Sequence, residues 1–269
     1  SGTTGEPKGV MLCHRNLTAN VYAVELTLPT MGMYTCLSIL PMHHTYEFTL
    51  SYLFVTATGG TIGIAEGLKS INKNIQEIQP DCLFCVPALI EKVSARIDKK
   101  IKDSKKEGLI KVMRFTAKCF SMRIRRKIFK QIHDGLGGNL KYLFCGAAPI
   151  DEKLVAKMES YGFIFLQGYG LTEAAPLIAV TQVKTRKAGV VGTPSEGTEI
   201  KIIPNNKSEK NNVGEIIAKG PGIMLGYYGN EEETNKVLKD GWLYTGDLGY
   251  FDKYGNLIVT KKKKNVIVT

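Results

Sequence analysis

The chain of 269 residues is long enough for one large domain or two ordinary ones. Hydrophobic residues make up 43% and charged residues 23% of it, a balance that excludes a disordered or fibrous protein. The net charge of +11 would suggest a nucleic-acid binder, but 14 basic and only 3 acidic residues lie within 96–130 and the rest of the chain is neutral.

The ends of the chain and its cysteines bound the interpretation further. No apolar run reaches the roughly 18 residues of a membrane span. The chain opens on small polar residues without an initiator Met or signal peptide and stops within a strand-like run, so we expect a fragment of a longer protein. Six cysteines indicate a reduced, cytosolic protein. Cys82 and Cys85 fall on opposite faces of an expected strand, which predicts buried core residues rather than a metal site or disulfide.

Strands and helices alternate along the first two thirds of the chain. Short apolar runs predict strands at 60–65, 82–86, 140–145 and 164–166. Start and stop residues predict a helix capped by Ser70 and stopped by Pro80, a helix opened by Pro87, and a helix capped by Asp151 and ended by Gly162. This order predicts an α/β fold with a parallel sheet layered with helices on both faces.

From within 96–130 to just beyond it, apolar residues recur at helical spacing among the basic ones. They are Met113, Ala117, Phe120, Ile124, Ile128 and Ile132. A basic amphipathic helix can lie on an anionic membrane surface. We expect a helix packed on the core with a solvated basic face, and keep contact with a membrane as a hypothesis.

The pattern changes after about residue 179. Glycines and short β-branched runs at 190–192, 199–203, 214–218 and 257–259 predict a small antiparallel β-barrel or sandwich. One short helix capped by Asn230 interrupts these runs, and a polar hairpin loop is expected over 204–212.

The first nine residues are typical of an anion-binding loop. Glycines let backbone N–H groups point inward, hydroxyls add donors, and Lys8 adds a mobile positive charge. The other residues of this loop that would contact phosphate are Ser1, Gly2, Thr3, Thr4 and Gly5. Because Gly9 follows Lys8, the segment is not a Walker A loop. A surface loop with a chance lysine is the alternative.

Four further segments complete a pattern that resembles the adenylate-forming enzymes, the superfamily of acyl-CoA synthetases, luciferases and peptide-synthetase adenylation domains. They read Leu-Pro-Met-His-His-Thr-Tyr-Glu at 40–47, Cys-Gly-Ala-Ala-Pro at 145–149, Gln-Gly-Tyr-Gly-Leu-Thr-Glu-Ala at 167–174 and Trp-Leu-Tyr-Thr-Gly-Asp-Leu-Gly at 242–249. Within the superfamily, Pro-Met-His-His and the basic insert are most similar to long-chain fatty acyl-CoA synthetases.

The resemblance implies a two-step ligase reaction. A carboxylate, here expected to be a fatty acid, attacks the α-phosphate of ATP to give acyl-AMP and pyrophosphate, and the thiol of coenzyme A then displaces AMP. The implied ligands are therefore ATP or AMP, Mg²⁺ and coenzyme A, with no nucleic acid. The implied location is cytoplasmic, with a peripheral contact on the inner membrane surface.

The resemblance also implies a set of catalytic residues. Lys8 and the hydroxyls of Thr3 and Thr4 would hold the β- and γ-phosphates. Glu173 would hold Mg²⁺, and Thr172 would bond the α-phosphate. His44 matches a histidine near the substrate carboxylate.

The remaining implied residues bind adenosine. Tyr169, between Gly168 and Gly170, would stack on adenine, and Gly146, Ala147 and Ala148 would line the other side of the base. Asp247 would accept hydrogen bonds from both ribose hydroxyls. Lys262 stands where the family has arginine and would contact the nucleotide without arginine's planar fork.

The family pattern divides the chain into three parts. We expect an α/β nucleotide- and acyl-binding subdomain over 1–179, a β-rich subdomain with the ribose motif over 180–259, and a hinge strand over 260–269 that leads to a C-terminal lid absent from the chain. The fragment should then bind nucleotide but turn over poorly.

Two alternatives remain. One is an adenylation domain that loads an amino or aryl acid onto a carrier protein. Nothing in 46–49 looks like the aspartate that anchors amino groups there, although Glu47 is close to it. The other is a module without catalysis that binds a nucleotide or a membrane, or a nucleic acid through the basic segment.

Overall fold

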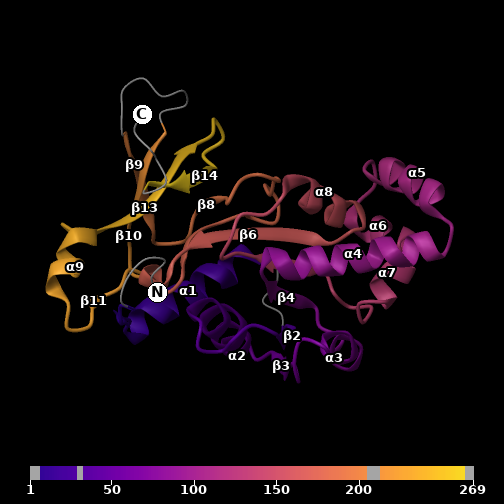
Figure 1. Ribbon diagram of the computed structural model, residues 1–269, viewed down its shortest axis with the longest axis horizontal. Coiled ribbons are helices and arrows are strands. Elements are labelled where there is room, and N and C mark those ends of the chain that lie inside the picture. Colours follow the sequence, from indigo (N-terminus) through magenta and orange to yellow (C-terminus); the bar gives the residue numbers. More distant parts are fainter. Residues whose placement is uncertain (1–6, 29–32, 205–212, 264–269) are drawn as a thin grey trace. The chain divides into compact units, whose positions relative to one another are not determined.

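The computed structural model describes residues 7–28, 33–204 and 213–263 and divides into two compact units (Figure 1). Unit 1 comprises residues 1–29 and 167–269, and unit 2 comprises residues 30–166. Most of the predicted loop over 204–212 and the end of the predicted hinge lie outside the described residues. The predicted boundaries at 179 and 259 stay a prediction.

Unit 2 is built on parallel strands in the order β3 (Thr61–Ile64), β2 (Thr35–Ser38), β4 (Cys82–Cys85) and β5 (Tyr142–Cys145). In the register, Cys36 pairs with both Ile62 and Cys82, and Leu83 pairs with Leu143. The strand β6 (Ile164–Gly170) begins in this unit and continues into unit 1. The predicted parallel sheet is confirmed.

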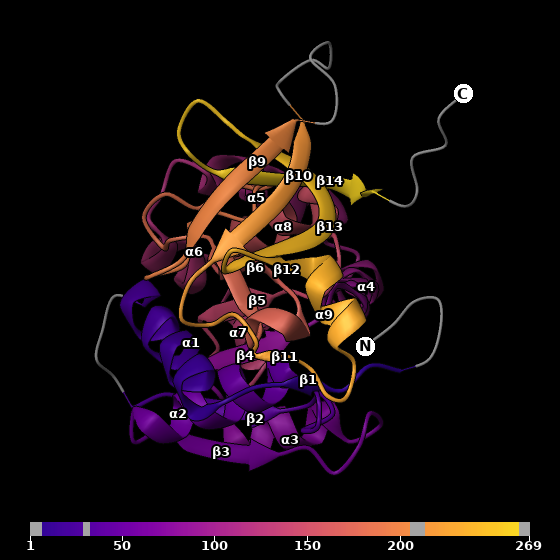
Figure 2. The same ribbon diagram turned by 90° about the vertical axis from the view of Figure 1, so that its left-hand side faces the viewer.

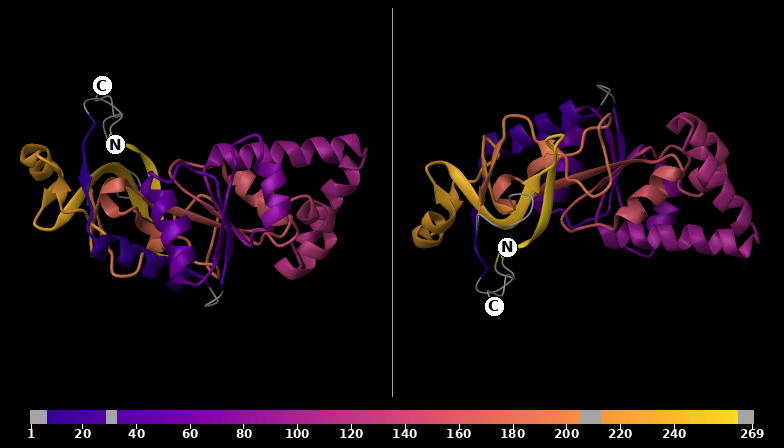
Figure 3. Two further views of the ribbon diagram at one scale, coloured as in Figure 1. Left: turned by 90° about the horizontal axis from the view of Figure 1, so that it is seen from below. Right: turned by 90° about the horizontal axis from the view of Figure 1, so that it is seen from above.

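Helices cover both faces of this sheet, as the alternation of side chains along β4 demonstrates. Leu83 points to one face, where it meets helices α3 (Ile71–Ile78), α4 (Pro87–Asp103) and α8 (Glu152–Ser160). The ring of Phe84 points to the other and contacts Tyr46 and Phe54, beside the π-helical segment η1 (Glu47–Leu53) and the short helix α2 (Phe54–Ala57). The helices beside the strands are visible in Figure 3.

The expected helix starts and stops are confirmed, although the hydroxyl of Ser70, at the N-cap position of α3, forms no capping hydrogen bond with the described residues. Pro87 occupies the first turn of α4, and the carboxylate of Asp151 accepts a hydrogen bond from the N–H of Lys153 at 2.8 Å at the start of α8. The helix α8 stops just before Gly162, whose φ of +98° is in the left-handed region. The helix α3 stops at Gln79, one residue before Pro80.

The basic segment is not one continuous amphipathic helix, so that expectation is wrong. The chain forms α5 (Glu107–Ala117), α6 (Met122–Ile128) and α7 (Lys130–Asp134). The guanidinium of Arg125 donates to the carbonyls of Lys118, Phe120 and Glu159 at 2.7, 3.0 and 3.1 Å. The bonds to Lys118 and Phe120 satisfy carbonyls that a continuous helix would have used itself, and they stabilise the break.

Unit 1 combines the helix α1 (His14–Thr27) with antiparallel strands (Figure 2). After β6, the chain adds β7 (Leu177–Val180) and β8 (Thr193–Pro194) to it in turn. A five-stranded sheet contains β9 (Glu199–Pro204), β10 (Gly214–Lys219), β12 (Leu238–Lys239), β13 (Trp242–Phe251) and β14 (Leu257–Lys262). The predicted antiparallel architecture is confirmed, although residues 190–192 form only a bridge, between Gly192 and Leu257.

Two short elements complete unit 1. Strand β1 (Val10–Met11) pairs antiparallel with β11 (Gly226–Tyr227). The expected short helix is α9 (Glu231–Val237), and the side chain of Asn230 caps it by accepting from the N–H of Glu233 at 3.0 Å. All six cysteines are free thiols, and both Cys82 and Cys85 are buried as predicted. None of the described helices is long and apolar enough to cross a membrane.

Candidate nucleotide site

Pairing of β1 with β11 brings the end of the predicted phosphate loop to the predicted metal-binding carboxylate. Val10 lies opposite Tyr227, and the ammonium of Lys8 sits 5.0 Å from the centre of the Tyr227 ring. The hydroxyl of Tyr227 donates to Oε1 of Glu173 at 2.8 Å. Lys8 also forms an ion pair with Glu233 of α9. Lys8 and Glu173, far apart in sequence, therefore both contact one tyrosine.

The electrostatics of this group follow from its hydrogen bonds. Burial, together with the adjacent Glu173 carboxylate, raises the pKa of Tyr227 above its usual range, so its hydroxyl stays a donor. Lys236 and then Lys8 lower the pKa of Glu233 to about 2. The Glu233 carboxylate is thus ionised at any ordinary pH and can hold Lys8.

A network of buried amides fixes the backbone around Glu173. The turn η2 (Thr172–Ala174) is anchored on α1, where the amide of Asn20 donates to the carbonyl of Ala174 at 3.0 Å and accepts from the N–H of Leu177 at 2.7 Å. The carbonyl of Glu173 accepts from the N–H of Met224 at 2.9 Å. Asn16, one turn before Asn20, donates to the carbonyls of Pro221 and Ile223 at 2.8 Å each.

These positioning residues were missed by the sequence analysis. Asn16 and Asn20 are 4% and 3% exposed within a helix. Asparagine is a poor helix former, so two of them one turn apart were a signal that their amides bond elsewhere. Tyr227 and Glu233 gave no comparable signal.

The environment of Glu173 fits a magnesium ion bound together with phosphate. Its carboxylate is 8% exposed, and Oε2 has no hydrogen-bond partner among the described residues. Mg²⁺ usually takes one or two carboxylates, with substrate phosphates and waters filling its other positions. Within the described part of the chain, no cluster of three or more His, Cys, Asp or Glu side chains could hold a metal by itself.

The predicted adenine and ribose residues also meet. The hydroxyl of Tyr169 on β6 donates to Oδ2 of Asp247 on β13 at 2.9 Å. Lys262, opposite Asp247 on β14, places its ammonium 3.0 Å from Oδ1. Asp247 and Tyr169 are 7% and 9% exposed. Burial first, and then the Asp247 carboxylate, raises the pKa of Tyr169 well above its usual range. Lys262, which the sequence pattern places where the family has arginine, thus lies beside the carboxylate of Asp247.

Packing requires a glycine at 170 and leaves little space at Gly168. A Cβ on Gly170 would overlap the carbonyl of Pro176, and a Cβ on Gly168 would lie 3.0 Å from a methyl of Leu177. The backbone just before β7 therefore leaves no room for a side chain at Gly170, whereas a Cβ at Gly168 would only require the end of the Leu177 side chain to shift. Their predicted contact with adenine stays a prediction, and so does the predicted hydrogen bond from Thr172, which is half-buried in η2, to the α-phosphate.

In unit 2, His44 lies in the exposed turn after β2. The ring Nδ1 of His44 accepts a hydrogen bond from the backbone N–H of Tyr46 at 3.2 Å, and the backbone N–H of His44 donates to the carbonyl of Pro41 at 2.9 Å. Since Nδ1 is an acceptor here, the neutral ring carries its proton on Nε2. The exposed imidazole therefore has an N–H donor at Nε2, which suits a carboxylate.

Glu47 occupies the interior of unit 2. Its side chain is 0% exposed, and Oε1 accepts from the hydroxyl of Ser38 at 2.6 Å. Among the residues that the structure describes, none forms a hydrogen bond with Oε2. Burial raises the pKa of Glu47 against the opposing effect of Ser38. A carboxyl held this way is not presented to the amino group of a substrate.

The predicted adenine turn follows β5 directly. The N–H of Gly146 donates to the carbonyl of Cys85 at 3.3 Å, and both Ala147 and Ala148 are exposed. Ala147 has a φ of +66°, a left-handed conformation that is costly for any residue with a Cβ. Such strain concentrates at ligand-binding turns. The other predicted contacts, Ser1, Gly2, Thr3, Thr4 and Gly5, lie outside the described residues.

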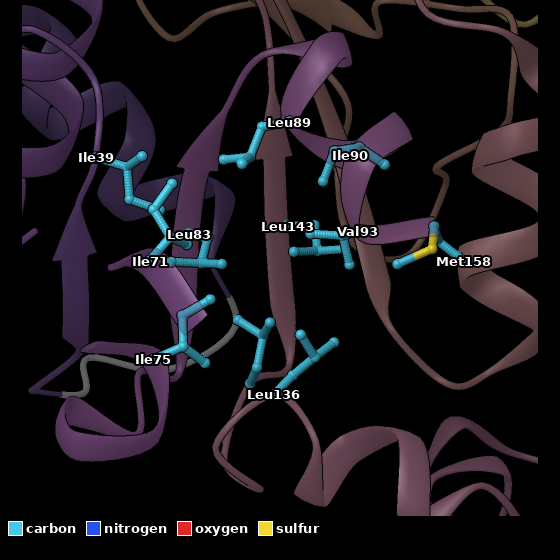
Figure 4. Close-up of a pocket in the computed structure, with 11 residues that line it drawn as sticks. Ile39, Ile71, Ile75, Leu83, Leu89, Ile90, Val93, Leu136, Leu143 and Met158 are labelled. Atoms are coloured by element: carbon cyan, nitrogen blue, oxygen red, sulfur yellow. The ribbon is translucent and has the colours of Figure 1, made fainter. Parts of the chain in front are cut away.

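A small apolar cavity lies between β4, β5 and the helices α3, α4 and α8 (Figure 4). Its volume is about 10 Å³ and only apolar side chains line it, among them Ile75, Leu83, Ile90, Leu143 and Met158. That volume holds about one water molecule, and the lining offers such a water no partner. The cavity is a packing gap and is too small for an acyl chain.

Comparison with known proteins identifies relatives over the whole chain. The AMP-binding enzyme family model matches residues 1–228. Fatty acyl-CoA synthetase B of Dictyostelium discoideum is 31% identical over 288 residues, which cover 99% of this chain and 42% of that protein. Long-chain-fatty-acid–CoA ligase 5 of Rattus norvegicus is 32% identical over 285 residues, covering 99% of this chain and 41% of that protein. The chain thus spans about two fifths of the length of these relatives.

A solved structure has the same fold. The o-succinylbenzoate coenzyme A synthetase of Bacillus subtilis, in complex with ATP and a magnesium ion, superposes with a TM-score of 0.72 at 25% identity. The match covers 100% of this chain and 50% of that one.

Proposed function

Because the chain belongs to the AMP-binding enzyme family, whose adenylate-forming members include the acyl-CoA synthetases, we propose that the protein is an ATP-dependent acid–thiol ligase acting on long-chain fatty acids. In this reaction the carboxylate attacks the α-phosphate of ATP and releases pyrophosphate, giving acyl-AMP. The thiol of coenzyme A then attacks the acyl carbon, loses its proton and displaces AMP, giving acyl-CoA. The fatty substrate is proposed because both curated relatives described above are named for fatty acids.

One observation carries the proposal. Lys8, Tyr227 and Glu173 form one contiguous group in unit 1, and Tyr169, Asp247 and Lys262 form another. The two groups are connected through β6 and η2, because Tyr169 and Glu173 are four residues apart. Lys8 and Glu173 in the first group suit phosphate and Mg²⁺, and Asp247 in the second suits ribose.

Each residue has a role that its surroundings support. Lys8 would exchange its ion pair with Glu233 for the phosphates, and Oε2 of Glu173 would donate to Mg²⁺, which supplies charge neutralisation at the phosphates. Asp247 would accept from the ribose hydroxyls. The Nε2 proton of His44 would orient the substrate carboxylate.

The same proposal covers ligands and location. ATP or AMP, Mg²⁺ and coenzyme A are the ligands, since the Bacillus subtilis relative is a coenzyme A synthetase in complex with ATP and magnesium. The proposal also has Gly168, Gly170 and Gly146–Ala148 contact the adenine, and Thr172 the α-phosphate. We propose a cytoplasmic protein that contacts the inner membrane surface, where its lipid substrate resides.

The alternative substrate class, an amino acid, is disfavoured by one feature. The carboxyl of Glu47, the acidic group nearest the expected anchoring position, is wholly buried and bonded to Ser38. An aryl acid would need no such anchor and is distinguished by experiment.

An ATP–pyrophosphate exchange screen of the full-length protein tests the proposal. Fatty acids should support exchange, while amino acids and o-succinylbenzoate should not. Glu173→Gln should abolish exchange, whereas Glu77→Gln, on the exposed side of α3, should leave it unchanged. Exchange only with an amino or aryl acid would contradict the substrate assignment, and no exchange with any acid would contradict the ligase assignment. We further propose that the 269 residues alone bind nucleotide and exchange pyrophosphate more slowly than the full-length protein.

A further inference from the structure

The helix α5 has apolar side chains on both of its sides. Its inner side carries Ile110, Met113 and Ala117, of which Ala117 is fully buried. Its outer side carries Leu109, Val112 and Phe115, one turn apart, with exposed fractions of 59, 61 and 75%. A helix that is apolar all round normally has both sides covered. The outer set is called the α5 face below.

The α5 face does not belong to the apolar pattern seen in the sequence. That pattern ran through Met113, Ala117 and Phe120 and marks mainly the inner side. In Figure 1, α5 lies at the edge of the group of helices α4 to α8. Phe120 and Ile124 follow α5 in the chain and are 46 and 43% exposed. Exposed apolar groups gathered along one helix mark an interaction surface.

The charges around α5 separate into two groups. Between residues 105 and 127 the chain has 9 basic residues and 1 acidic residue, Glu107. Three arginines turn inward: Arg114 donates to the hydroxyl of Ser160 at 2.8 Å, Arg125 bonds three carbonyls, and Arg126 donates to the carbonyls of Gly138 and Leu140. These three serve the fold.

The other six cations point outward. Lys105, Lys106, Lys111, Lys118, Arg123 and Lys127 are exposed and form no ion pair within the described part of the chain. They precede α5, lie on it, follow it directly at Lys118, or lie on α6. An apolar strip accompanied by unpaired cations is complementary to a surface with an apolar interior and anionic headgroups.

We infer that the α5 face docks on an anionic lipid bilayer, with Leu109, Val112 and Phe115 inserted below the headgroups and the six outward cations bound to them. The helix is 11 residues long, about 16 Å, so it lies in the interface plane and does not span the bilayer. The inference deepens the proposed contact with a membrane, but vesicle binding needs neither nucleotide nor acid, so it can fail or succeed independently of the proposed reaction.

Co-sedimentation with vesicles tests the inference, using both the full-length protein and the 269-residue chain. Vesicles of phosphatidylcholine mixed with phosphatidylglycerol should bind the protein, and phosphatidylcholine alone should bind it weakly. Val112→Ser combined with Phe115→Ser should weaken binding by about tenfold or more. Lys111→Gln combined with Lys118→Gln should weaken it by about 30-fold and lower its salt dependence.

Matched controls use equally exposed residues elsewhere. Ile64 and Leu68, each 73% exposed, give the apolar control Ile64→Ser with Leu68→Ser. Lys69→Gln with Lys153→Gln is the charge control. Circular dichroism and melting temperature establish that every variant is folded. Both controls should bind vesicles like the unaltered protein.

A second readout uses a cysteine already present. Cys119 follows α5 directly and is exposed, so an environment-sensitive fluorophore on it, with Cys13→Ser removing the half-buried thiol, should shift to the blue on anionic vesicles. Equal binding to neutral and anionic vesicles, or α5 variants that bind like the controls, would overturn the inference. A change of oligomeric state in Val112→Ser with Phe115→Ser would also overturn it and would assign the α5 face to contact with a second copy of the chain. Vesicle binding by the 269-residue chain but not by the full-length protein would overturn it too, and would assign the face to contact with another part of the same protein.

Discussion

Replacing Tyr227 with phenylalanine probes the group that joins Lys8 to Glu173. The change removes one hydroxyl, whose hydrogen bond to Oε1 of Glu173 is 2.8 Å long. Both side chains are under a tenth exposed, so water cannot replace the lost donor. The aromatic ring and its contact with the Lys8 ammonium remain.

The magnitude follows from the charged acceptor. A hydrogen bond to an ionised group contributes about 1.5–3 kcal/mol, and its loss leaves a buried carboxylate with one partner fewer. For a protein of this size, that corresponds to a fall in melting temperature of about 3–12 °C. We expect Tyr227→Phe to be destabilised by this amount without ligand.

Magnesium and ATP should reverse the effect. Mg²⁺ at Oε2 would neutralise the charge of the Glu173 carboxylate, so the hydrogen bond from Tyr227 to Oε1 should contribute less in the bound state than in the free protein. The variant should then bind Mg²⁺–ATP more tightly, by up to the same 1.5–3 kcal/mol, or about 10–150-fold. The melting temperatures of the two proteins should therefore converge as Mg²⁺–ATP is added.

Thermal unfolding with and without Mg²⁺–ATP measures this difference. Tyr254→Phe is the control, because Tyr254 is 69% exposed and should lose no stability in either condition. A Tyr227→Phe melting temperature equal to that of the unaltered protein, or a deficit that Mg²⁺–ATP leaves unchanged, would refute the reasoning.

Three further predictions concern charge and pH. Asp247→Asn replaces one of two acceptors by a donor and should raise the KM for ATP in pyrophosphate exchange by about tenfold or more; Asp252→Asn, in the turn before β14, should not. Burial lowers the pKa of His133 below 6.5. The contribution of the neutral ring to folding stability is therefore complete above pH 6.5 and is lost as pH falls through the lowered pKa. Denaturant titrations should show a smaller loss of stability at low pH in His133→Gln than in the unaltered protein. Burial raises the pKa of Glu47 above 4.5, so stability present at lower pH is lost as pH rises through the raised pKa; Glu47→Gln should be the more stable protein at neutral pH, and equal stability would contradict this.

Sequence patterns sufficed where a feature is local. The apolar strands, the caps at Asp151 and Asn230, and the glycine-flanked Tyr169 depend on residues within a few positions of one another. The motifs also grouped Asp247 with Lys262, and the structure places the two side chains in contact, because a family pattern carries long-range information that composition does not.

The contacts that the sequence concealed depend on distant pairing. Tyr227 reaches Lys8 and Glu173 because two-residue strands pair, and two residues show no periodicity. The break between α5 and α6 was hidden because apolar residues keep their helical spacing across it, while Arg125 satisfies the carbonyls exposed there.

Calorimetric titration of the 269-residue chain with AMP tests the central claim, that these residues contain an AMP-binding site with Asp247 at the ribose. The account predicts saturable binding of one AMP per chain. It also predicts that 2′,3′-dideoxy-AMP binds about tenfold more weakly or worse. This nucleotide lacks the two ribose hydroxyls whose hydrogen bonds the carboxylate of Asp247 accepts. Equal affinity for the two nucleotides, or no binding of AMP, would contradict it.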